Sequence, residues 1–139
     1  MEHDADGRRP SPAFAETALP ERFDALAPDG SEIRLLCRLP SGSMAHGTLP
    51  PGAVSLAVTH RTVAEIWFVT GGAAEVWRKD GGEERVVAVA PGDSLTIPLG
   101  VHFQFRTVGA SPFTFIMCTM PPWPGEDEAI RVEGCWGER

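Results

Sequence analysis

The stretch THRTVAEIWFVTGG, residues 59–72, decides the fold of this chain. It places His60 five residues before Glu65, continues in an apolar, β-rich run and closes on a Gly-Gly turn. His102 enters through a second stretch built from a tight turn, a short strand and a Pro-Gly corner, PGDSLTIPLGVHFQFR at residues 91–106. We therefore expect the rest of the chain to be a scaffold that brings these two stretches together.

Short apolar runs alternate with turn residues from about residue 30 to about residue 120. About nine strand-like segments recur at a spacing of roughly 8–12 residues, without a 3.6-residue periodicity between them. The strongest hairpin signal is Asp80-Gly81-Gly82, because Asp-Gly pairs favour the tight turns that join antiparallel strands. The pattern predicts an all-β fold, a single antiparallel sandwich or barrel.

The chain is expected to be one domain with an irregular segment at each end. Residues 1–28 include a stretch rich in Pro, Ala and acidic residues without periodicity, which predicts a flexible arm. Residues 29–120 carry the predicted strands and form the barrel. Residues 121–139 begin with three prolines in four residues, so this tail cannot continue a central strand. Trp123 and Trp136 are expected to pack the tail on the barrel or on a dimer partner.

Charge and composition argue against several classes of protein. The net charge of −7 over 139 residues disfavours nucleic-acid binding, which needs a concentrated basic face. No apolar run approaches the ~18 residues of a membrane-spanning helix, and the first residues lack the apolar segment of a signal peptide. Cys37, Cys118 and Cys135 form no CxxC pair, which disfavours a disulfide framework or a zinc knuckle. We expect a soluble, cytoplasmic protein without membrane or nucleic-acid partners.

Strand alternation gathers the polar residues of the two stretches on three faces, because residues two apart share a face. The three groups are His60 with Val58, Glu65 with Trp67, and His102 with Gln104 and Arg106. Any one of these side chains alone is better explained as an ordinary strand residue. If all three faces point into the barrel, two imidazoles and one carboxylate converge in an apolar cavity. That donor set around open positions suits Fe(II) and other first-row divalent metals.

The two stretches resemble the paired motifs of the cupin superfamily, which are small jelly-roll barrels. The first family motif runs Gly, five residues, His-x-His, three or four residues, Glu, six residues, Gly. The second runs Gly, five residues, Pro-x-Gly, two residues, His, three residues, Asn. This chain matches the first with His60, Glu65 and Gly72, and the second with Gly92, Pro98, Gly100 and His102. The resemblance covers roughly residues 30 to 120 and implies the cupin fold, a double-stranded β-helix.

The departures from the motifs matter for metal binding. Val58 stands where the first motif has its first His, and Arg106 stands where the second has its Asn. One residue rather than two separates Gly100 from His102. The resemblance therefore implies either a reduced metal site, with Gln104 or a water filling in, or a site without metal.

Three functions follow from these alternatives, because cupins host many reactions. The first, which we favour, is a small-molecule enzyme whose divalent metal, Fe, Mn, Ni or Zn, is held by His60, Glu65 and His102. Its chemistry would be of the oxygenase or the isomerase and cyclase type. The second is a metal-free isomerase, epimerase or cyclase that uses His60 and His102 as acid and base. The third is a barrel that binds a metabolite without turning it over.

Further side chains are expected to shape the substrate pocket, namely His46, Val58, Trp67, Gln104 and Arg106. An inward Arg106 would grip the carboxylate or phosphate of an anionic substrate, whereas an outward Arg106 would be an ordinary solvated residue. The run of residues 113–117, FTFIM, is apolar on both faces. This run predicts a homodimer, in which a partner subunit covers the outer face.

Overall fold

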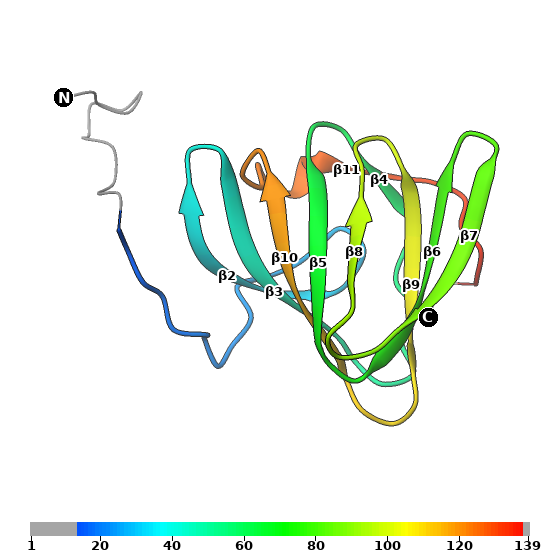
Figure 1. Cartoon of the computed structure of the whole chain (residues 1–139), viewed down its shortest axis with the longest axis horizontal. Helices are drawn as coiled ribbons and strands as arrows, with labels where there is room; N and C mark the ends of the chain where they lie inside the picture. Colours follow the sequence, from blue (N-terminus) through cyan, green and yellow to red (C-terminus); the bar gives the residue numbers. More distant parts are fainter. Residues whose placement is uncertain (1–13, 138–139) are drawn as a thin grey trace.

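The computed structural model describes residues 14–137 and consists of two antiparallel β-sheets, shown in Figure 1. The six-stranded sheet has the order β1-β2-β3-β10-β5-β8, with β1 Ala25–Leu26, β2 Glu32–Leu39, β3 Gly42–Leu49, β10 Phe113–Met120, β5 Ala64–Gly71 and β8 Ser94–Ile97. The five-stranded sheet has the order β11-β4-β9-β6-β7, with β11 Ala129–Arg131, β4 Val58–His60, β9 His102–Val108, β6 Ala73–Asp80 and β7 Glu83–Val89. A short 3-10 helix, η1 Glu126–Glu128, precedes β11. The predicted all-β, antiparallel class is confirmed.

The core lies between the two sheets and follows from strict alternation along the central strands. On β5, Glu65, Trp67 and Val69 are buried while the residues between them are exposed. On the neighbouring β10, Phe115 is fully buried, and its ring stacks on that of Trp67 with 4.2 Å between centroids. Aromatic side chains bury large apolar areas, so this inner face supplies much of the hydrophobic stabilisation.

Two turns show why the chain folds back where the sequence indicates. The predicted hairpin joins β6 to β7, with Asp80 paired to Glu83 around Gly81, whose φ of 59° is left-handed. Gly72, between β5 and β6, also has a positive φ of 69°. A Cβ at Gly72 would overlap the carbonyl of Pro112, so the last Gly of the first motif is required by both conformation and space.

The segments that flank the predicted barrel extend both of its sheets. Ala25 and Leu26, which fall within the expected arm, pair with Ile33 and Glu32 of β2. At the other end of the chain, β11 pairs with β4. Both segments therefore reach the end of the barrel that holds the site described below. Within residues 14–137, none of the helical structure is long and apolar enough to span a membrane.

Candidate functional site

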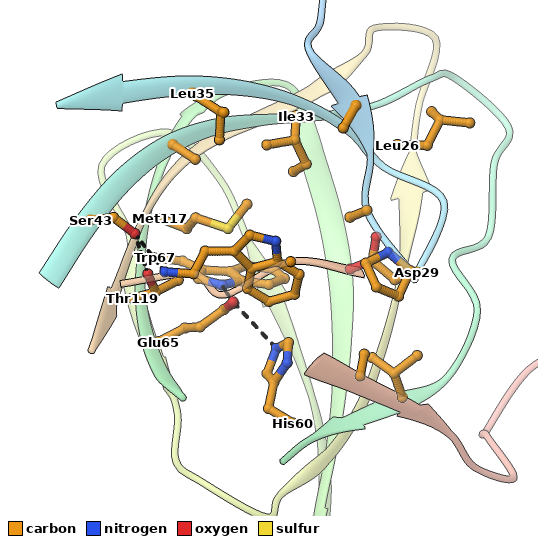
Figure 2. A pocket seen from close by; sticks show the side chains of 18 residues that line it. Leu26, Asp29, Ile33, Leu35, Ser43, His60, Glu65, Trp67, Met117 and Thr119 are labelled. Carbon is orange, nitrogen blue, oxygen red and sulfur yellow. Dashed lines mark hydrogen bonds and ion pairs between the residues drawn. The ribbon is translucent and has the colours of Figure 1, made fainter. Parts of the chain in front are cut away.

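A cavity of about 240 Å³ lies at one end of the barrel and is walled mainly by apolar side chains. Its floor is the inner face of the six-stranded sheet, and residues of β1, β4 and β11 close its sides. Figure 2 shows His60, Glu65, Asp29 and Trp67 directed toward this space. A small apolar cavity with a few converging polar groups is the usual form of a small-molecule site.

His60 and Glu65 form the polar centre of the cavity. His60 ends β4 and Glu65 opens the inner face of β5; their Nε2 and Oε2 atoms are 3.3 Å apart, and only 5% and 3% of the side chains are exposed. The indole N–H of Trp67 donates a 2.8 Å hydrogen bond to the other Glu65 oxygen, Oε1. Neither ring nitrogen of His60 has a hydrogen-bond partner among the described residues. The imidazole is thus buried and aligned, with its hydrogen-bonding capacity unused.

A polar row crosses the inner face beside this pair. Ser43 on β3 and Thr119 on β10 are cross-strand partners and share a hydroxyl–hydroxyl hydrogen bond. Thr119 is also the cross-strand partner of Glu65. The Ser43 hydroxyl in turn accepts the backbone N–H of Trp123, 3.0 Å away, so the C-terminal segment is fastened over this edge of the cavity.

Glu128 brings a second carboxylate to His60. Its carboxylate accepts hydrogen bonds from the backbone N–H and hydroxyl of Thr62, both 2.6 Å, and from the backbone N–H of Val63, 3.0 Å. Burial alone would raise the pKa of Glu128, but these hydrogen bonds and His60 outweigh burial and lower it. Oε2 lies 4.0 Å from His60 Nδ1. The imidazole is therefore held between two carboxylates.

Asp29 is a further acidic residue of the cavity. Its Oδ1 accepts the backbone N–H of Ser31 at 2.9 Å and the Ser31 hydroxyl at 2.6 Å. Burial raises the pKa of the Asp29 carboxyl above its ordinary value, despite these hydrogen bonds, and the charge of Glu65 adds to the increase. Sequence reasoning missed both Asp29 and Glu128, because Asp29-Gly30 indicated only a turn and Glu128 lies in a segment without periodicity.

The structure does not bring His102 to His60 and Glu65. On β9 the inner positions are occupied by Phe103 and Phe105, which are 1% and 0% exposed. The alternate residues His102, Gln104 and Arg106 therefore face outward. The physical reason is the missing residue after Gly100: a shift of one residue moves a strand side chain to the opposite face. Counted with the motif's two-residue spacing, the place of the second-motif His is occupied by Phe103.

Gln104 and Arg106 hold the C-terminal segment on the outer face of the five-stranded sheet. Gln104 Nε2 donates to the carbonyls of Ser55 and Trp136, and its Oε1 accepts the backbone N–H groups of Cys135 and Trp136, all at 2.9–3.0 Å. Arg106 bonds Glu75 twice, at 2.9 and 2.7 Å, and lies 4.4 Å from the centre of the Trp136 ring. Neither side chain lines the cavity, so the inward orientation of Arg106 is not observed.

The other predicted pocket residues divide between the two faces of their sheets. Val58 and Trp67 line the cavity and are 1% exposed. His46 lies between inward-facing Ala45 and Gly47 on β3, on the outer face of the six-stranded sheet. Burial and the nearby Arg34 lower the pKa of His46. His46 therefore cannot shape the cavity directly.

The donor set does not fit a divalent metal. The four inner positions that correspond to motif ligands hold Val58, His60, Glu65 and Phe103, so two of them are hydrocarbon. Within residues 14–137, no group of three or more His, Cys, Asp or Glu side chains has a metal-binding arrangement. First-row metals in proteins ordinarily take three or more such ligands. The reduced site of His60, Glu65 and His102 is not assembled.

Comparison with known proteins identifies the fold. A sequence model of the cupin domain matches residues 45–119. The xanthan biosynthesis protein XanB of Xanthomonas campestris pv. campestris is 37% identical over 90 residues, 65% of this chain and 18% of that protein. Oxalate decarboxylase from Bacillus subtilis superposes with a TM-score of 0.73 at 17% identity, over 88% of this chain and 33% of that one. KdgF from Halomonas sp. superposes with a TM-score of 0.64 at 18% identity, over 79% of this chain and 97% of that one.

These likenesses differ in what they establish. The chain spans only 18% of the length of XanB. The two solved structures are less than 20% identical, so they show the fold alone. The jelly-roll barrel predicted from the sequence is confirmed. Manganese(II) centres are known in the Bacillus subtilis oxalate decarboxylase, and that metal is a property of that protein.

Proposed function

The chain belongs to the cupin domain family, and on this premise we propose that it is a small-molecule enzyme that transfers protons with His60 and Glu65. The observation that carries the proposal is the buried pair itself, 3.3 Å apart at the wall of an apolar cavity. Positioned His and Glu side chains are the usual general acids and bases of enzymes. The reactions that fit are isomerisation, epimerisation or cyclisation of a small metabolite.

The surroundings of His60 suit it to act as the base. When His60 takes a proton from the substrate, the adjacent Glu65 carboxylate stabilises the imidazolium that forms. Trp67 fixes the Glu65 carboxylate by its hydrogen bond to Oε1, which leaves Oε2 facing the imidazole. Return of the proton to a different atom of the substrate gives an isomer, whereas return of a proton to the opposite face of the same carbon gives the epimer. Excluding water from the apolar cavity strengthens these interactions.

The competing hypothesis is a divalent metal held by His60, Glu65 and His102. It would require His102 to leave the outer face of β9 and would displace Phe103 from the core, where it packs 5.3 Å from the His60 ring. The manganese of oxalate decarboxylase is therefore not carried over to this chain.

An anionic substrate is also poorly matched, because Arg106 is paired with Glu75 outside the cavity. Proton-exchange NMR also distinguishes an enzyme from a protein that binds a metabolite without turnover.

Cys37, Cys118 and Cys135 are all free thiols, which suits the reducing cytoplasm in which we propose that the protein works.

Proton transfer can be detected before the substrate is named. The protein is incubated in D₂O with pools of small metabolites, and NMR identifies any compound whose C–H signal is lost by exchange with solvent or whose spectrum becomes that of an isomer. We expect exchange that survives EDTA and is lost in His60→Ala and Glu65→Gln. The matched control is His102→Ala, which removes the other imidazole of the motifs and should leave exchange unchanged.

Each of the other outcomes identifies a different function. Exchange that requires an added metal and is lost in His102→Ala would replace the proposal with the metal enzyme. A compound that binds tightly and is recovered without exchange or rearrangement would indicate a binding protein instead of an enzyme.

A further inference from the structure

The ionisable side chains that line the cavity are unbalanced in charge. They are two carboxylates, Asp29 and Glu65, and one imidazole, His60; the described lining includes no Lys or Arg. A third carboxylate, that of Glu128, lies directly behind the imidazole. In Figure 2, Asp29 and Glu65 lie on opposite sides of the space, with His60 between them.

The hydrogen bonds of the protein leave part of this acidic lining without a partner. Glu128 accepts three hydrogen bonds from Thr62 and Val63, and Glu65 accepts one from the indole N–H of Trp67 and faces His60. In the described part of the chain, Asp29 receives both of its hydrogen bonds on Oδ1, from Ser31, and none on Oδ2. The buried ring nitrogens of His60 likewise lack hydrogen-bond partners among those residues. Glu65 is buried and Asp29 is half-buried. Carboxylates shielded from water are costly without compensating partners, so a donor group supplied by a ligand would stabilise this lining.

The walls of the cavity favour an apolar body that carries a positive charge. Trp67 lines the cavity at 1% exposure, and Trp123 lines it with its ring at 86° to that of His60 and 5.5 Å between the ring centroids. Indole faces attract organic cations, and the attraction grows when the cation leaves water. The hydroxyls of Ser43 and Thr119 add oxygen acceptors on the same wall.

We propose that the ligand of this cavity is a small organic amine, bound as its cation with the ammonium group toward Asp29 and Glu65 and its apolar body between the aromatic walls. This inference rests on the proposed function, since it names the class of molecule on which the His60–Glu65 pair would act. The proposal restricts the substrate of the His60–Glu65 pair to one charge class.

The test uses three probes that share one apolar body and differ in charge: benzylamine, benzyl alcohol and benzoate. Isothermal titration calorimetry measures their affinity for the full chain at neutral pH. We expect benzylamine to bind about tenfold or more tightly than benzyl alcohol, and benzoate to bind least. Asp29→Asn keeps the acceptor oxygen for Ser31 and should reduce benzylamine affinity about tenfold, with benzyl alcohol affinity unchanged.

Asp80→Asn is the matched control, because Asp80 is an exposed carboxylate at the end of β6 outside the cavity. It removes the same charge from the chain and should leave all three affinities unchanged. Glu65→Gln is a second cavity variant, to be used with benzylamine if Asp29→Asn unfolds.

Benzoate binding as tightly as benzylamine, or no benzylamine binding up to about 10 mM, would overturn the inference. So would an equal loss of benzylamine affinity in Asp29→Asn and Asp80→Asn, which would indicate a nonspecific effect of net charge. A different result contradicts the proposed function: no compound exchanges protons in a reaction that depends on His60. That result does not depend on which ligand charge the cavity prefers.

Discussion

Val58 on β4 lies directly opposite Phe103 on β9, and both side chains are 1% exposed on the inner face of the five-stranded sheet. Both occupy places where the two cupin motifs have histidines. Hydrocarbon therefore stands at two of the four ligand positions, while the other two hold His60 and Glu65, 3.3 Å apart. Because only His60 and Glu65 remain of the four ligand positions, the site favours acid–base chemistry over metal binding.

Restoring the two imidazoles should create a metal site. We expect Val58→His/Phe103→His to bind Co(II) or Zn(II) in about one equivalent, because three His and one Glu would then converge on the inner face. The unsubstituted protein should carry less than about 0.1 equivalent after purification without chelator. Calorimetry and elemental analysis measure both, and circular dichroism checks that the double variant is folded.

Removing His102 from the restored protein is the informative control. Because His102 faces outward from β9, Val58→His/His102→Ala/Phe103→His should bind metal as well as the double variant does. A tenfold loss of metal affinity would show that His102 reaches the cavity, and would support the metal site of His60, Glu65 and His102.

The fate of β9 also shows what the sequence could and could not predict. The face of β5 followed from alternation and from the preserved spacing between Glu65 and Gly72. On β9 the motif placed polar residues inward, yet Phe103 and Phe105 are the apolar pair, and burying each side chain is worth about 2–3 kcal/mol. The hydrophobic effect decides the face, and the shortened spacing after Gly100 permits it.

The other features that the sequence did not predict depend on contacts between residues far apart in the chain. Glu128 meets Thr62 across a separation of 66 residues, and Gln104 meets Trp136 across 32. Neither contact leaves a local pattern in the sequence, because no strand or turn periodicity links the partners. The barrel could be predicted from its motifs, whereas the carboxylates around His60 required the folded chain.

Glu128→Gln should destabilise the protein in a pH-dependent way. The folded-state pKa of Glu128 lies below its ordinary value of 4.5, so its contribution is present above that value and is lost as pH falls through the lowered pKa. We expect a loss of about 1–3 kcal/mol in the free energy of unfolding at neutral pH, since charged hydrogen bonds to Thr62 and Val63 are weakened. Urea unfolding at several pH values should show the difference shrinking toward strong acid.

Asp29→Asn should have the opposite dependence on pH. The folded-state pKa of Asp29 is raised above its ordinary value of 3.8, so the folded protein binds the proton more tightly than the unfolded chain. Stability attributable to Asp29 is therefore full below 3.8 and declines as pH rises through the raised pKa. Relative to the unsubstituted protein, Asp29→Asn should gain stability as the pH rises above 3.8, measured by urea unfolding. A difference independent of pH would contradict this.

Gln104→Leu should release the C-terminal segment without altering the cavity's own side chains. The substitution removes four hydrogen bonds and leaves the N–H groups of Cys135 and Trp136 without their acceptor. We expect a loss of about 2–4 kcal/mol in unfolding free energy, and faster amide exchange at Cys135 and Trp136. His102→Leu, on the same outer face of β9, is the control and should leave exchange of these amides unchanged.

The homodimer remains a prediction, and the outer face of the six-stranded sheet is where it can be tested. Ile66 and Phe68 on β5 are 46% and 50% exposed, and Met44 on β3 is 41% exposed; cross-strand pairing through Cys118 and Ile116 joins them into one apolar surface. Large exposed apolar surfaces are uncommon on monomers, and a second copy would present the same face across a two-fold axis.

Light scattering should give twice the 15.0 kDa chain mass for the unsubstituted protein and the chain mass for Phe68→Glu. Val86→Glu, on exposed β7 of the other sheet, should remain dimeric; a 15.0 kDa particle for the unsubstituted protein at micromolar concentration would refute the dimer.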